Sequence, residues 1–229
     1  MTDHPSHDPI SRRRLFGLAA GAIAAGALVA TGCSDMNRGA SVDRGDTGAD
    51  TRGNWGGNLF EPPLDKPDVT FTDLDGDPFD LREKTADQLS LLFFGYTSCP
   101  NECPIYLSTL ASARESIRSG PGSRPQVLFV GVDTARDTPE AMRTYLDNID
   151  STFIGLTASP EVIDDALGQL MLPGVALDEP DDAGNYIVGH PSRAIAFTPD
   201  NVAHRMYGYD TRQTQWVRDL PLLAQGKWQ

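Results

Sequence analysis

Residues 91–104 read Leu-Leu-Phe-Phe-Gly-Tyr-Thr-Ser-Cys-Pro-Asn-Glu-Cys-Pro, and this stretch is the most informative part of the chain. The apolar run that enters it, residues 89–95, is typical of a central strand buried on both faces of a sheet. Cys103 and Pro104 then open a predicted helix over residues 103–119, because proline is favoured in the first turn of a helix. The two cysteines therefore lie between a buried strand and the helix that follows it.

Outward from this stretch, strands and helices alternate. Thr138 and Pro139 begin a second helix, as an N-cap and a first-turn proline. The expected elements are a hairpin of 69–73 and 78–81, strands 127–132 and 153–156, helices 139–146 and 159–170, an antiparallel pair of 186–188 with 194–197, and a last helix over 214–225. This order predicts an α/β fold, a thioredoxin-like sandwich with a central mixed sheet flanked by helices.

The N-terminus has the features of an export signal. Ser11 is followed by Arg12-Arg13-Arg14-Leu15-Phe16, a twin-arginine pattern, and then by an Ala/Gly-rich apolar run that ends near Ala30. That run is short for a membrane span of about 20 residues. It leads into Thr31-Gly32-Cys33, which resembles a lipoprotein cleavage box. We therefore expect residues 1–32 to be a twin-arginine lipoprotein signal peptide and Cys33 to be lipidated; a retained signal anchor is the alternative.

The remaining chain divides into two parts. Residues 33–63 are rich in Gly, Asp, Arg and Asn, which predicts a flexible tether. Residues 64–229 are long enough for one domain with a full core. Under either interpretation of the signal, this domain is expected outside the cell membrane and attached to it. The formal net charge of −13 argues against binding to nucleic acid.

Cysteine usage favours a functional pair. The chain has three cysteines, so a lipidated Cys33 leaves Cys99 and Cys103 as the other two. A disulfide closing so short a loop would constrain the unfolded chain little. Close thiols either cross-link reversibly or hold a soft metal ion. Their three-residue separation differs from the two residues of a redox CxxC. Cys103 is closer to the helix N-terminus and is expected to be the more acidic thiol.

A metal site needs a further ligand, and two histidines remain beyond the signal. His190 lies between two late strands, at a place that in this plan faces the cysteines, whereas His204 follows a turn and is expected to be exposed. Two thiolates and one imidazole suit Cu(I), while Cu(II) would need a further ligand. Structural zinc, the competing ion, usually has four protein ligands.

The sequence resembles the Sco/SenC family of copper-binding, thioredoxin-fold proteins that take part in cytochrome c oxidase assembly. The resemblance covers roughly residues 60–225 and rests on three segments: the cysteine motif 94–104, Val-Asp-Thr-Ala-Arg-Asp-Thr-Pro at 132–139, and Tyr-Ile-Val-Gly-His at 186–190. It departs from the family at Gly189, where aspartate is frequent, and at Pro191, where serine or threonine is usual. These departures bear on affinity and redox tuning.

The resemblance implies that Cys99, Cys103 and His190 bind copper and that the two cysteines form a redox-active disulfide. Asp133 and Asp137 are candidates for groups beside the metal; the alternative is that Asp133 ends a strand and Arg136 pairs with Asp137. The implied partners are the copper-site subunit of cytochrome c oxidase and a thiol reductant or another copper chaperone. A metal-independent thiol–disulfide oxidoreductase or peroxidase is the competing function.

Overall fold

The computed structural model describes residues 54–117 and 124–229. The predicted signal peptide, the lipidation site Cys33 and most of the predicted tether lie outside the described residues. Within the described residues, no helix combines the length and the apolar character that a membrane span requires.

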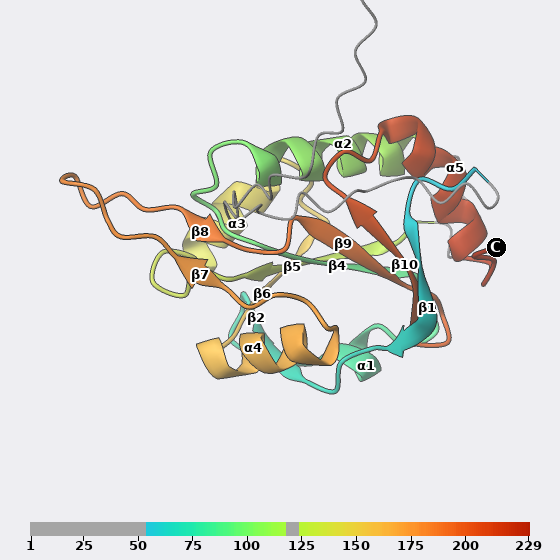
Figure 1. Cartoon of the computed structure of the whole chain (residues 1–229), viewed down its shortest axis with the longest axis horizontal. Coiled ribbons are helices and arrows are strands. Elements are labelled where there is room, and N and C mark those ends of the chain that lie inside the picture. Colours follow the sequence, from blue (N-terminus) through green and yellow to red (C-terminus); the bar gives the residue numbers. More distant parts are fainter. Residues whose placement is uncertain (1–53, 118–123) are drawn as a thin grey trace, which may run out of the picture. The chain divides into compact units, whose positions relative to one another are not determined.

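An eight-stranded mixed sheet is the centre of the fold, in the order β1-β10-β9-β4-β5-β6-β2-β3 (Figure 1). The sheet strands are β1 (Asn58–Asp65), β2 (Thr70–Asp73), β3 (Pro78–Asp80), β4 (Ser90–Gly95), β5 (Gln126–Gly131), β6 (Ile154–Thr157), β9 (Arg193–Phe197) and β10 (Val202–Gly208). A separate two-stranded sheet pairs β7 (Ala176–Leu177) with β8 (Val188–Gly189). The helices are α1 (Leu81–Lys84), α2 (Glu102–Ser116), α3 (Pro139–Asp147), α4 (Pro160–Gln169) and α5 (Gln213–Leu223).

Helices cover both faces of the sheet. Strands β4, β5 and β6 run parallel, and the connecting helices α2 and α3 lie on one face (Figure 1), as the usual right-handed crossover predicts. Helix α5 packs beside α2, and α4 lies on the opposite side of the sheet with α1 (Figure 1). Every residue of β4 is buried, as the apolar run predicted. The predicted thioredoxin-like sandwich is therefore confirmed.

The predicted pairing of 186–188 with 194–197 is wrong. Strand β9 pairs instead with β4 and with β10, and β8 pairs with β7. A turn with Asn201 in the left-handed region (φ 64°) joins β9 to β10 as a tight hairpin, which occupies the edge of β9 that β8 was expected to take. Because β7 consists of two exposed residues, it carries no apolar pattern that sequence reasoning could recognise.

The described fold begins before residue 64. Strand β1 starts at Asn58 and pairs with β10, and Trp55 is buried, so residues assigned to the tether contribute to the sheet. Pro62 and Pro63 conceal this strand in the sequence. Proline lacks a backbone N–H and is accepted in edge strands, and β1 is an edge strand with an irregular register between Leu59 and Leu64.

Candidate metal centre

The two cysteines differ in their surroundings. The chain leaves β4 at Gly95, passes Cys99 in a loop and enters α2 just before Cys103. Cys103 is fully buried in the core, while Cys99 is half-buried. The backbone N–H of Cys103 donates to Sγ of Cys99 at 3.4 Å, because the first N–H groups of a helix have no partner within it. Both cysteines are free thiols in this structure.

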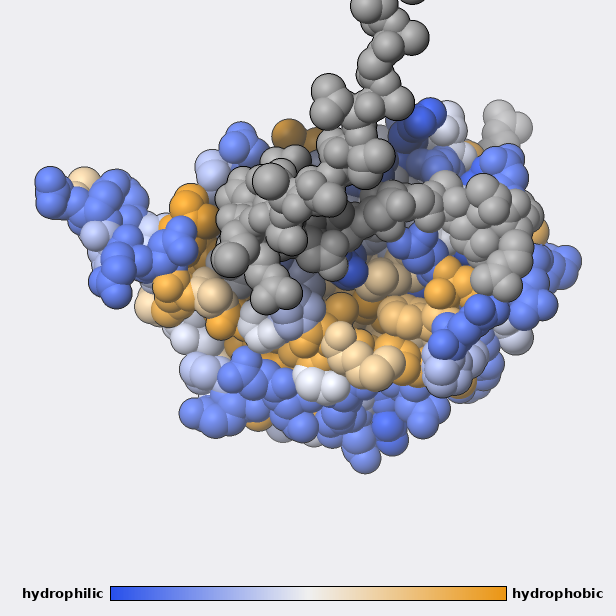
Figure 2. Space-filling model, in the orientation of Figure 1, coloured by the Kyte–Doolittle hydropathy of each residue, from blue (hydrophilic) through white to orange (hydrophobic). Residues whose placement is uncertain are grey.

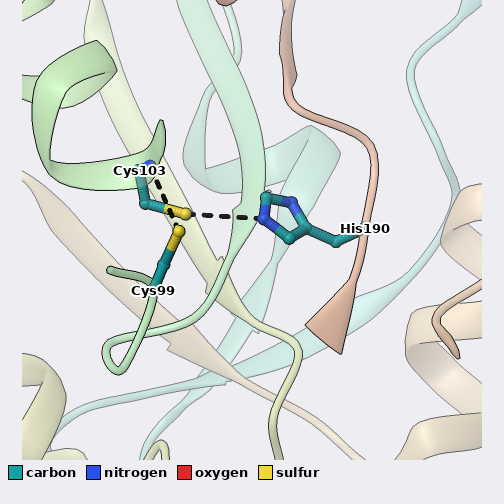
Figure 3. A group of neighbouring side chains, drawn as sticks. All are labelled: Cys99, Cys103 and His190. Carbon is teal, nitrogen blue, oxygen red and sulfur yellow. Dashed lines mark hydrogen bonds between the residues drawn. The ribbon is translucent and has the colours of Figure 1, made fainter. Parts of the chain in front are cut away.

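His190 approaches the cysteines from the other side (Figure 3). It follows β8, and its Nε2 lies 3.6 Å from Sγ of Cys103. One ligand atom from each of Cys99, Cys103 and His190 lies within 4.8 Å of the others. The rings of Tyr96 and Phe93 meet the imidazole edge-on, with centroids 5.5 and 6.2 Å away. The structure thus brings together all three predicted ligands.

A pocket of about 270 Å³ opens beside this group. Its walls come from the cysteine loop and from the segment around β8, and they include Tyr96, Cys99, Glu102, Ile187 and His190. Cys103 does not line it. An incoming group would therefore meet Cys99 and His190 first and the buried thiol last.

The acidity of the two thiols is opposite to the expectation from sequence. The hydrogen bond from the Cys103 thiol, together with backbone N–H groups, holds the pKa of Cys99 well below that of an ordinary thiol. The pKa of Cys103 is raised, first by its role as that donor and then by burial. Cys103 is nearer the helix N-terminus, but the charge settles on the sulfur that solvent and several donors can reach.

We expect Cys99 to react selectively with a thiol-alkylating reagent. Because its pKa is lowered, Cys99 is still a thiolate at pH 6, where an ordinary thiol of pKa about 8.5 is protonated. Treatment of the reduced, metal-free domain with iodoacetamide at pH 6, followed by peptide mass analysis, should label Cys99 ahead of Cys103. Equal labelling in the folded protein would contradict the assignment; a urea-unfolded sample supplies the control in which both react alike.

His204, the second histidine beyond the signal, is buried in the domain. His204 lies on β10, is buried, and stacks on Trp228 with ring centroids 3.6 Å apart. The expectation that it is exposed is wrong, because β10 is an interior strand and the C-terminal Trp228 covers the ring. It is not a member of the Cys99, Cys103 and His190 group.

Asp133 and Asp137 are buried, and their carboxylates bind groups of neighbouring loops rather than Cys99, Cys103 or His190. Asp137 accepts hydrogen bonds from the backbone N–H and the hydroxyl of Thr97, at 2.8 and 2.7 Å. Asp133 pairs with Arg136 and accepts a hydrogen bond from the Tyr186 hydroxyl at 2.9 Å. The alternative in which Arg136 pairs with Asp137 is therefore wrong. Among the described residues, no hydrogen bond joins either carboxylate to Cys99, Cys103 or His190.

Sequence reasoning missed several residues around the site. Sequence reasoning gives no role to Tyr96 or Tyr186. It also misses the hydrogen bond that Ser192 Oγ, in the loop between β8 and β9, donates to Glu102 Oε2 at the start of α2, at 2.5 Å. A tyrosine in a strand or loop usually indicates packing, so its type alone gives no signal. The contacts become visible only once the loops are placed together.

The donor set fits a soft metal ion. Two sulfurs, one from the loop before α2 and one from its first turn, converge with Nε2 of His190. The other imidazole nitrogen, Nδ1 of His190, is buried with no hydrogen-bond partner among the described residues. Soft thiolates with imidazole favour copper, and a closed zinc site would need a fourth protein ligand. The residues present therefore fit copper.

Comparison with known proteins identifies one family for this chain. A sequence model described as SCO1/SenC matches residues 62–225. An SCO2-like protein of Rickettsia conorii is 33% identical over 127 residues, which cover 55% of this chain and 60% of that protein. The matched region spans about half to two thirds of the length of the curated relatives.

Solved structures agree on the fold. Apo Sco1 from Thermus thermophilus superposes with a TM-score of 0.65 at 29% identity, covering 74% of this chain and 96% of that one. Copper-bound yeast Sco1 superposes with a TM-score of 0.62 at 23% identity, over 69% of this chain and 87% of that chain, which supports the fold alone. Because the SCO1/SenC model matches residues 62–225, more than half of the sequence, this chain belongs to the SCO1/SenC family.

Proposed function

We propose that this protein is an extracytoplasmic copper chaperone that binds copper through Cys99, Cys103 and His190. The observation that carries the proposal is the convergence of these two sulfurs and one imidazole nitrogen within 4.8 Å, beside a pocket open to solvent. The delivery site is the dinuclear copper site of cytochrome c oxidase. The family to which the chain belongs supports this assignment.

Ligand exchange would move the ion without releasing it. A thiolate of the receiving subunit enters the pocket and bonds to copper as one of the three ligands leaves. Cys99 and His190 line the pocket and Cys103 does not, so the buried thiolate is the ligand that leaves last. Copper keeps at least two ligands throughout this sequence.

The location of the protein is part of the same proposal. The twin-arginine segment, the cleavage box ending at Cys33 and the polar tether together describe a lipid-anchored protein on the outer face of the cell membrane. The acidic chain suits a basic partner surface. Fractionation of cells that produce the full chain tests this part.

A thiol–disulfide function of the same cysteines is the second candidate. The lowered pKa of Cys99 and its partial exposure are what a nucleophilic thiolate requires. Cys99 and Cys103 would then reduce a disulfide of the receiving subunit to two thiols and become a disulfide themselves, and a separate thiol reductant would restore them. This function does not use the imidazole of His190.

Copper transfer tests the first candidate against the second. The reduced domain, loaded with one equivalent of Cu(I), is mixed with the metal-free soluble domain of the oxidase copper-site subunit, and copper in each is measured after separation. We expect transfer from the native protein and loss of tight binding in His190→Ala. If His190→Ala binds and delivers copper like the native domain, while Cys99→Ser abolishes its cellular role, the thiol–disulfide function replaces the chaperone function.

A further inference from the structure

The strand that presents His190 lies outside the main sheet. Among the strands of the described residues, β7 and β8 pair only with each other, in the register Ala176 with Gly189 and Leu177 with Val188. We call residues 176–189 the ligand hairpin. It extends from the body of the protein (Figure 1), and its far end is hydrophilic in Figure 2. The large sheet holds the chain after His190, where β9 begins at Arg193, but no main-chain pairing joins the ligand hairpin itself to that sheet.

Side chains of one loop hold the ligand hairpin at Tyr186, while Val188 of the hairpin packs into the core. Residues 133–137, between β5 and α3, form what we call the bracket loop. Its Arg136 donates to the carbonyl oxygen of Tyr186 at 3.2 Å, and its guanidinium lies 3.6 Å from the centre of the Tyr186 ring. The Tyr186 hydroxyl returns a hydrogen bond to Asp133. Three contacts thus converge on a residue four positions before His190.

The same loop also holds the cysteine side of the site. Asp137 accepts both hydrogen bonds from Thr97, two residues before Cys99. Its other carboxylate oxygen accepts from the backbone N–H of Asp133 at 3.0 Å, so the two ends of the bracket loop are tied together. Gly131 permits this packing, since a Cβ there would lie 2.9 Å from that of Asp137.

Arg136 is also near the aromatic ring that touches the ligand. Its guanidinium lies 5.9 Å from the centre of the Tyr96 ring, and that ring meets His190 edge-on. A cation between two aromatic rings is attracted to both, and a planar guanidinium does this better than an ammonium. The contact therefore links the ligand hairpin, the bracket loop and the cysteine loop.

From these contacts we infer that Arg136 and Tyr186 are positioning residues, which hold His190 at bonding distance from the thiolate pair. The inference rests on the copper site proposed above. Arg136 and Tyr186 touch no ligand atom; they fix where the imidazole stands. Outer groups that orient metal ligands typically change affinity by about 10–100-fold when they are removed.

A double-mutant cycle tests this role. Cu(I) affinity is measured by competition with a chromophoric chelator for the native domain, Arg136→Ala, His190→Ala and the double variant. We expect Arg136→Ala to weaken binding by about 10–100-fold when His190 is present and to change little when it is absent. Tyr186→Phe, which keeps the stacked ring, should lose less than Tyr186→Ala. Arg143→Ala, on α3 in an exposed pair with Asp75, is the matched control.

The outcomes separate the inference from the proposed function. If His190→Ala weakens binding but Arg136→Ala does not, the positioning role is wrong and the copper site stands. Equal losses from Arg136→Ala with and without His190 would assign Arg136 to general stability, which also overturns the inference. If His190→Ala has no effect, the three-ligand site itself fails.

A measurement without metal tests the positioning role even if His190→Ala leaves copper affinity unchanged. Hydrogen exchange of the reduced apo domain should show faster exchange at the ligand hairpin in Arg136→Ala than in the native protein, with the rates of β4 and β5 unchanged. Unchanged exchange at the hairpin would mean that Arg136 does not hold it, whatever the metal affinity.

Discussion

Replacement of Cys103 by serine is expected to lower Cu(I) affinity by more than the roughly 100-fold that loss of an outer group can cost. The variant removes a thiolate and leaves a hydroxyl, which is a poor ligand for a soft ion. The Cys103 sulfur also lies 3.6 Å from Nε2 of His190, so its loss removes one of the three ligand atoms that meet at this site. Competition with a Cu(I) chelator measures the change.

Two further variants make this result decisive. A buried serine leaves a polar group in the core, and such a group costs about 1–3 kcal/mol when it has no partner. Cys103→Ala removes the ligand without adding that group, so both variants should lose copper although their stabilities differ. Ser98→Ala, an exposed change in the same loop, should bind like the native domain. Native-like affinity in Cys103→Ala would rule out the buried thiolate as a ligand.

Replacement of Asp219 by alanine is expected to lower the free energy of unfolding by about 3–5 kcal/mol. Asp219 is fully buried on α5 and holds three elements together. One carboxylate oxygen accepts from the N–H of Gly56 at 2.7 Å and the hydroxyl of Tyr207 at 3.2 Å, and the other accepts from Arg218 at 2.7 Å. The alanine would leave these donors without their acceptor.

Urea denaturation with calorimetry measures this loss, which corresponds to a fall in Tm on the order of 10 °C for a domain of this size. Asp182→Ala, an exposed change near the tip of the ligand hairpin, should stay within about 0.5 kcal/mol of the native domain. Asp219→Asn keeps one acceptor oxygen, so its Tm should lie between those of Asp219→Ala and Asp182→Ala. A native-like Tm in Asp219→Ala would show that the carboxylate does not join α5 to the sheet.

The sequence predicts the centre of the fold and the three ligands because both depend on local patterns. The apolar run before Cys99, the helix signals at Cys103 and Thr138, and the cysteine spacing are each contained within a few residues. His190 could be selected because few histidines remain beyond the signal.

The remaining features depend on contacts that no local pattern records. The acidity of Cys99 arises from donors placed around its sulfur by the loop, and burial of His204 depends on Trp228 at the end of the chain. Proline hides β1, and two exposed residues make up β7. One of the two alternatives from sequence paired Arg136 with its neighbour Asp137, but the structure pairs it with Asp133 and with the carbonyl oxygen of Tyr186.

The position of His190 directly after a hairpin that lies outside the main sheet has a consequence for the energy scale of copper release. Local opening of a segment held by a few pairings and one loop costs far less free energy than unfolding of a domain. A receiving protein can therefore take the imidazole away from the ion while the core around Cys103 keeps its structure. The stable core around Cys103 thus retains copper, while the less stable ligand hairpin controls its release. Substitutions in one part can change its function and leave the other part unchanged.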